Sequence, residues 1–97
     1  MILGEVIGTV VATRKDENLS GMKFQIVKVV DVNLNPTGNF VIAVDAVGAG
    51  YGEIVLCAQG SSARMTEKTQ NRPVDAVIMG IVDTIEIGGK KVFEKYA

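Results

Sequence analysis

Residues that could carry out chemistry are scarce in this chain, which has 97 residues, no His and a single Cys. Ser61 and Ser62 form an adjacent hydroxyl pair, but a serine nucleophile needs a base to accept its proton, and the commonest base is absent. Cys57 lies in an apolar segment with no base close in sequence, which is typical of a packed thiol. We therefore expect no nucleophilic catalysis and no disulfide within the chain.

Five carboxylates fall near the ends of expected strands, and in principle two of them could form an acid–base pair: Asp31, Asp45, Glu53, Asp75 and Asp83. At strand ends a solvated or hydrogen-bonded carboxylate is the ordinary outcome. The spacing of these residues matches no metal-ligand pattern. We therefore expect no enzyme activity, no metal and no cofactor.

The glycine-rich segment Gly48-Ala-Gly-Tyr-Gly52 invites comparison with loops that hold phosphate. Such a loop must lead from a strand into a helix, whose amides and dipole meet the anion. Here the segment leads into another expected strand and into Glu53, whose charge would repel phosphate. We interpret it as a tight turn at which chains come close together.

The charge balance argues against a nucleic-acid partner. Lys and Arg total 10 and Asp and Glu total 11, so the net charge is −1. The five aromatic residues, at positions 24, 40, 51, 93 and 96, are not interleaved with cations as in a single-strand binding groove. An oligonucleotide-binding module remains an alternative, which fluorescence anisotropy with a labelled single strand at low salt would test.

No segment has the length of an apolar membrane span, and the first residues lack the basic start of a signal peptide. We expect a cytoplasmic protein with no membrane partner, and an unpaired Cys57 suits a reducing compartment.

The elements that must position these residues are strands, because apolar residues alternate at period two in block after block. The first expected strand covers 2–13, and its even positions form a small apolar face that another backbone can approach closely. The second covers 22–32, with Met22, Phe24, Ile26, Val30 and Val32 on one face. The third and fourth cover 40–47 and 53–58.

A short helix is expected from Ser61, as its N-cap, to about Thr66. The last long strand covers 76–87, and Gly80 in its middle indicates a bulge. Gly88-Gly89 then predicts a hairpin that returns the tail, 90–96. We predict one all-β domain over 1–97, a small closed five-stranded OB-like barrel with one short helix between strands four and five and a C-terminal hairpin strand.

The apolar fraction, 47%, is higher than one small core needs, so part of it is expected to face another subunit. The residues alone do not distinguish a pentamer from a hexamer.

An ordered set of motifs resembles the EutN/CcmL family over essentially the whole chain. The motifs are Gly4–Thr13, Leu19–Lys23, Ala43–Glu53, Gly60–Arg64 and Pro73–Asp83. The resemblance implies an OB-like barrel that assembles into a structural pentamer. This pentamer would cap the fivefold vertices of a bacterial microcompartment shell, such as a carboxysome, whose facets are tiled by hexameric shell proteins.

Two groups of residues are candidates for the subunit boundary. The first is Gly48, Gly50, Tyr51, Gly52 and Glu53, and the second is Ser61, Ser62 and Arg64. The alternative for both is an ordinary turn or helix cap within one chain. A small enzyme or cofactor-binding subunit of an encapsulated pathway is a further rival, which a search for bound metal or cofactor by native mass spectrometry would test.

Overall fold

The computed structural model describes residues 1–96, which form seven strands and two 3-10 helices. The strands are β1 (Ile2–Val10), β2 (Phe24–Val30), β3 (Pro36–Asp45), β4 (Ile54–Gln59), β5 (Ala76–Ile81), β6 (Thr84–Ile87) and β7 (Lys90–Glu94). The helices are η1 (Glu17–Leu19) and η2 (Gly60–Arg64).

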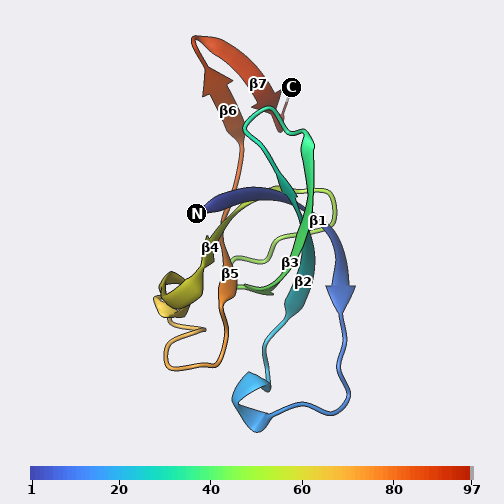
Figure 1. Cartoon of the computed structure of the whole chain (residues 1–97), viewed down its shortest axis with the longest axis vertical. Coiled ribbons are helices and arrows are strands. Elements are labelled where there is room, and N and C mark those ends of the chain that lie inside the picture. Colours follow the sequence, from blue (N-terminus) through green and yellow to red (C-terminus); the bar gives the residue numbers. More distant parts are fainter. Residues whose placement is uncertain (97) are drawn as a thin grey trace.

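The first five strands close into a barrel in the order β1-β2-β3-β5-β4 (Figure 1). Neighbouring strands are antiparallel except β3 and β5, whose parallel pairing joins Val44 to Val77 and closes the ring. Closure leaves these apolar strands without a free sheet edge. The predicted five-stranded barrel is therefore confirmed.

The interior of the barrel is filled by small and medium aliphatic side chains: Val6, Val27, Ala43, Ala49, Val55, Cys57, Ala76 and Ile78. Gly4 lies where β1 and β2 come closest, because a Cβ built on Gly4 would lie 2.2 Å from the Cγ1 atom of Val27. The predicted close approach to the small face of the first strand is confirmed at this position.

The second strand buries a different set of side chains inside the barrel from the apolar face predicted for it. Gln25 and Val27 point into the barrel, whereas Phe24 and Ile26 are only partly buried. A register shift between Lys28 and Val30 then brings Val30 inward. Alternation defines two faces of a strand, and a bulge exchanges them partway along it.

Gly80 lies at the bulge that its sequence position predicted. Leu56 pairs with Gly80 and Cys57 pairs with Ile78, so Met79 is the extra residue of β5. The predicted strand 76–87 is nevertheless two strands, because β5 ends at Ile81 and β6 belongs to a separate sheet.

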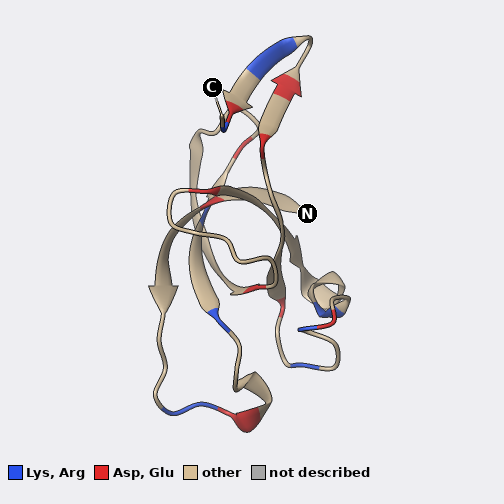
Figure 2. Ribbon diagram, turned by 180° about the vertical axis from the view of Figure 1, so that it is seen from behind, with Lys and Arg blue, Asp and Glu red and all other residues tan. Residues whose placement is uncertain are grey.

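The hairpin β6–β7 extends from the barrel along the long axis of the molecule (Figure 1). Gly88 and Gly89 both have positive φ, at 57° and 83°, as a type I′ turn requires, so the hairpin prediction is confirmed. Charged residues gather on the hairpin and on the connecting loops (Figure 2).

Several boundaries differ from the prediction. β1 ends at Val10 and β2 begins at Phe24, whereas β3 begins at Pro36, inside the predicted loop. That loop is shortened because the Asp31 carboxylate accepts hydrogen bonds from the amides of Asn33 and Asn35. The amide of Asn35 is the largest cause of a pKa of Asp31 below its usual value.

Candidate subunit interface

The loop between β3 and β4 contains all five residues of the first predicted boundary group. Its frame is the carboxylate of Asp45, which is almost fully buried. Asp45 Oδ1 accepts hydrogen bonds from the amides of Val47, Gly48 and Ala49 at 3.0, 2.9 and 3.2 Å. The loop therefore wraps around a single charged acceptor.

Gln25 holds Asp45 from the barrel side. Its Nε2 atom donates to Asp45 Oδ2 at 3.2 Å and to the carbonyl of Ala49 at 2.8 Å. Burial opposes ionisation of Asp45, but these amide hydrogen bonds outweigh it, and the pKa of Asp45 lies below its usual value. Gln25 is therefore buried on an otherwise apolar core face because it holds the Asp45 carboxylate and the carbonyl of Ala49 in place.

Glu53 closes the other end of the loop. Its Oε1 atom accepts from the amide of Gly50 at 2.7 Å, and Oε2 forms an ion pair with Lys95, which follows β7. The hydrogen bond from Lys95 is the main cause of a lowered pKa of Glu53, and the same contact raises the pKa of Lys95. The base of the hairpin is thereby tied to the loop.

The loop glycines have two different explanations. Gly48 and Gly52 have φ values of 76° and 83°, which favour glycine for backbone reasons within one chain. Gly50 does not have a positive φ, and a Cβ built on it would meet only Glu53 Oε1 at 3.4 Å. Tyr51, beside Gly50, is 82% exposed.

The second boundary group lies on η2. The prediction that Ser61 is the N-cap is wrong. The helix is a 3-10 helix that begins one residue earlier, at Gly60. Gln59 occupies the cap position, and its side chain forms no capping hydrogen bond. Gly60 is held instead by its amide, which donates to the carbonyl of Asp75 at 2.8 Å. Ser61, Ser62 and Arg64 are exposed.

Only Ala63 of η2 is buried, in a second small core outside the barrel with Val44, Ala58 and Val77. Arg64 forms no ion pair with any residue among 1–96. Its guanidinium is thus available to an acceptor outside the chain.

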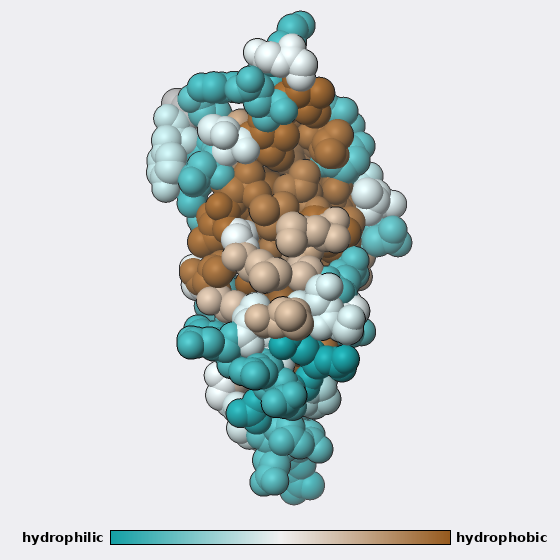
Figure 3. All heavy atoms as spheres, turned by 90° about the vertical axis from the view of Figure 1, so that its left-hand side faces the viewer, coloured by the Kyte–Doolittle hydropathy of each residue, from teal (hydrophilic) through white to brown (hydrophobic). Residues whose placement is uncertain are grey.

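An apolar face follows the outer side of β1, β4 and β5. Leu3 pairs with Leu56, and Leu56 pairs with Gly80, so these three positions form one row across the sheet. The side chain of Leu56 lies over Gly80, at 3.8 Å from a Cβ built there, and remains 37% exposed. Figure 3 shows a continuous apolar surface on this side of the molecule.

A second apolar face lies on β3, where Phe40 and Ile42 are 58% and 49% exposed. In the barrel order β3 is next to neither β1 nor β4, so Phe40 and Ile42 lie on a different part of the barrel wall from Leu3 and Leu56. Monomers rarely leave such surfaces uncovered. Two unlike faces on one subunit fit a head-to-tail contact rather than a symmetric pair.

The described residues offer few side chains that could hold a metal ion or act as a nucleophile. Within 1–96 there is no group of three His, Cys, Asp or Glu side chains that could hold a metal ion. Cys57 is buried, and burial raises the pKa of its thiol to about 11, so it stays protonated near neutral pH. No helix in this range is long and apolar enough to cross a bilayer.

Sequence comparisons identify relatives over nearly the whole chain. The family model described as "Ethanolamine utilisation protein EutN/carboxysome" matches residues 1–83. The bacterial microcompartment shell vertex protein GrpN of Rhodospirillum rubrum is 50% identical over 86 residues, which cover 89% of this chain and 97% of GrpN. The carboxysome shell vertex protein CcmL of Gloeobacter violaceus is 39% identical, covering 98% of this chain and 95% of CcmL.

Solved structures agree with the sequence matches. The Gloeobacter violaceus CcmL structure superposes with a TM-score of 0.96 at 38% identity and full coverage of both chains. The structure described as the pentameric microcompartment shell protein GrpN superposes with a TM-score of 0.79 at 49% identity, covering 90% of this chain and 98% of GrpN. With its barrel, its loop and its full-length relatives in agreement, the chain belongs to the EutN/CcmL family.

Proposed function

We propose that the chain is a structural vertex subunit of a bacterial microcompartment shell, and that five copies close into a ring at a fivefold corner. The observation that carries this proposal is the likeness to GrpN, a pentameric shell protein that is 49% identical over 90% of this chain. A shell of hexagonal tiles stays flat unless fivefold points interrupt it. A pentamer therefore supplies the curvature that a closed shell needs.

The two apolar faces support a ring. In a head-to-tail ring, the face with Leu56 on one subunit covers a different face on the next, and the contacts close after a fixed number of copies. Phe40 and Ile42 on β3 provide such a second face. Burial of these side chains would supply the main favourable free energy of assembly.

The loop 48–53 and the helix η2 are our candidates for more specific contacts. Tyr51 offers a large exposed ring with a hydroxyl, a residue type enriched at interfaces. Arg64 offers a guanidinium fork for a neighbour's carboxylate or backbone carbonyl. Hexameric shell proteins, located in the shell with it, are the partners that we propose at the outer rim of the pentamer.

The proposed pentamer makes a direct prediction for the purified protein. Native mass spectrometry is expected to give a species of five times the 10.3 kDa protomer mass. Arg64→Glu is expected to shift this species towards protomers, whereas Arg14→Glu, the same charge change at an exposed loop residue, should leave it unchanged. A wild-type mass of one or six protomers would contradict the pentamer.

Gly50→Val is expected to convert rings into protomers or aggregates, because a neighbouring chain would approach Gly50 closely. Within one chain the substitution is tolerable, since only the flexible end of Glu53 lies near the new Cβ. Circular dichroism should therefore show a folded barrel while native mass spectrometry shows a lost ring. An intact ring in this variant would exclude close approach at Gly50.

We propose neither nucleic acid as a partner nor catalysis as an activity. Phe40 is an exposed aromatic residue on a barrel strand, and it pairs across the sheet with Lys28. The ammonium of Lys28 forms an ion pair with Glu5 at 3.0 Å. That row lacks the unpaired cations that a single strand requires. Absence of anisotropy change with a labelled single strand at low salt would agree with this, and saturable binding would overturn it.

A further inference from the structure

The hairpin β6–β7 is anchored to the rest of the chain at its base. Its two strands pair with each other and with no barrel strand among residues 1–96. At the base, the amide of Lys95 donates to the carbonyl of Asp83 at 2.8 Å, and the Lys95 ammonium forms the ion pair with Glu53. From there the strands project along the long axis of the molecule (Figure 1). A two-stranded sheet is marginally stable by itself in water, so we expect the hairpin to need further packing.

The hairpin has one apolar face and one polar face. Ile85 pairs with Phe93 across the two strands, and Ile87, two residues after Ile85, lies on the same face. The opposite face carries exposed polar residues: Thr84, Glu86, Lys91 and Glu94. Such a division is typical of a sheet that is solvated on one side and covered on the other.

The described part of the chain does not cover the apolar face of the hairpin. Neither Ile85 nor Phe93 packs against either of the two buried clusters formed by residues among 1–96. These two side chains are half-buried, and Ile87 is 42% exposed. Another molecule is therefore needed to complete the packing.

The hairpin face continues the apolar face of the barrel that includes Leu56. β5 leads through a short connection into β6, and the amide of Val82 in this connection donates to the carbonyl of Ile54, at the start of β4, at 2.8 Å. Figure 3 shows the apolar surface extending from the barrel towards the end of the molecule that bears the hairpin. A neighbour that covers Leu56 would therefore also reach the hairpin.

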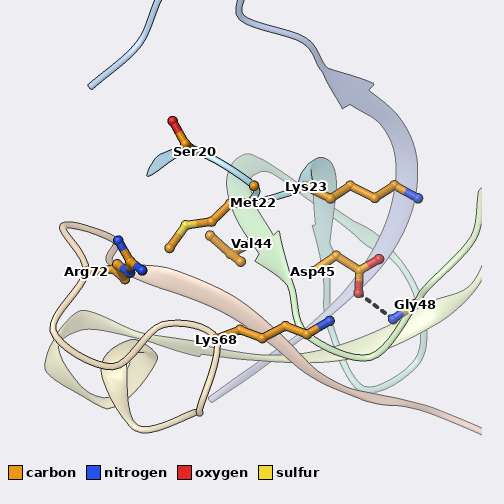
Figure 4. A pocket seen from close by; sticks show the side chains of 9 residues that line it. Ser20, Met22, Lys23, Val44, Asp45, Gly48, Lys68 and Arg72 are labelled. Carbon is orange, nitrogen blue, oxygen red and sulfur yellow. Dashed lines mark hydrogen bonds between the residues drawn. The ribbon is translucent and has the colours of Figure 1, made fainter. Parts of the chain in front are cut away.

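The pocket outside the barrel wall does not fit an apolar arm of a neighbour. It lies between the segment before β2 and the end of β3, and its lining includes Lys23, Lys68, Arg72 and the carboxylate of Asp45 (Figure 4). The ammonium of Lys23 points away from Lys68 and Arg72 (Figure 4). An apolar side chain inserted here would remove water from charged groups without replacing it.

We propose that the hairpin is an arm whose apolar face packs against the next copy of this chain, on the β3 face that carries Phe40 and Ile42. The inference rests on the proposed ring. Figure 1 places the turn before β3 at the same end of the molecule as the hairpin. The arm comprises residues 84–94, beyond the segment 1–83 that the family model matches, so it is a contact added to the ring by the end of this chain.

Ile87→Lys is expected to weaken the ring without unfolding the protomer, because residue 87 is already partly exposed in one chain. Native mass spectrometry over a dilution series should show the ring dissociating at about tenfold higher protomer concentration, as loss of one aliphatic contact predicts. Thr84→Lys adds a cation to the opposite face and is the matched control. Circular dichroism should show both variants folded.

The dilution series also separates this inference from the proposed function. A wild-type ring of five with the same dissociation for Ile87→Lys and Thr84→Lys would overturn the arm and leave the pentamer intact. A ring of six that Ile87→Lys weakens would contradict the pentamer and support the arm. A wild-type protomer would overturn both.

Photo-crosslinking tests the contact directly and does not depend on loss of assembly. p-Benzoylphenylalanine at position 87 is expected to give covalent dimers of neighbouring subunits within the ring, with the new bond on the peptide that contains Phe40. The same group at position 86, on the polar face, should give none. Cross-links confined to one chain, or no cross-links at position 87, would overturn the inference.

Discussion

Gly4→Ala is expected to destabilise the barrel strongly, by about 3 kcal/mol, the upper part of the range for overpacked cores. The new Cβ would lie 2.2 Å from Val27 Cγ1 and 3.0 Å from the carbonyl oxygen of Lys28. Val27 is fully buried and the second neighbour is backbone, so neither can move away cheaply. Urea unfolding at a fixed protomer concentration would measure the loss, because assembly makes stability concentration-dependent.

Gly8→Ala is the matched control for this prediction. It lies on the same strand, but its new Cβ would meet only Ile26 Cδ1, at 3.6 Å, an ordinary contact. The two substitutions make the same chemical change and remove the same backbone freedom in the unfolded chain. Equal midpoints of urea unfolding for the two variants would contradict the close approach of β1 and β2 at Gly4.

Asp45→Ala is expected to cost a further large amount, about 3 kcal/mol or more, and to release the loop between β3 and β4. Three backbone amides and the Gln25 side chain would lose their charged acceptor. Each hydrogen bond to a charged group contributes about 1.5–3 kcal/mol, although exposed amides at Val47 and Gly48 can turn to water. Faster hydrogen exchange at residues 47–49 would report the release directly.

The lowered pKa of Asp45 also predicts that the free energy of unfolding falls at acid pH. Its pKa is lower in the folded chain than the ordinary value of 3.8, so the stabilisation is fully present above that value. It is lost as the pH falls through the lower folded pKa. Asp45→Asn should therefore flatten the acid limb of the stability curve, whereas Asp83→Asn, at an exposed carboxylate, should not. An unchanged acid limb in Asp45→Asn would contradict the role of the charge.

The predicted hairpin and the predicted bulge illustrate where sequence reasoning succeeds. Gly88-Gly89 favours one turn type because few residues other than glycine adopt two successive positive φ angles. Gly80 in an apolar run favours a β-bulge for a similar local reason. The ordered motifs of the chain likewise predicted the family, and the family model matches residues 1–83.

The error at β2 shows where such reasoning stops. Its even positions are more apolar than its odd ones, yet Gln25 lies inside the barrel because it meets Asp45 and the carbonyl of Ala49 across the fold. No local pattern records a partner that lies 20 residues away in sequence. The Asp45 side chain could have been singled out from the sequence as a turn acceptor, but its buried partner could not.

The amino-acid sequence by itself determined the strand-rich composition, the turns and the family, because these depend on local backbone preferences and on an ordered set of motifs. Only the tertiary structure decided which face of each strand is buried and how Glu53 meets Lys95. It also decided that Lys23, Lys68 and Arg72 share one pocket. The physical reason is barrel closure, which brings together segments whose separation along the chain carries no information about their distance in space.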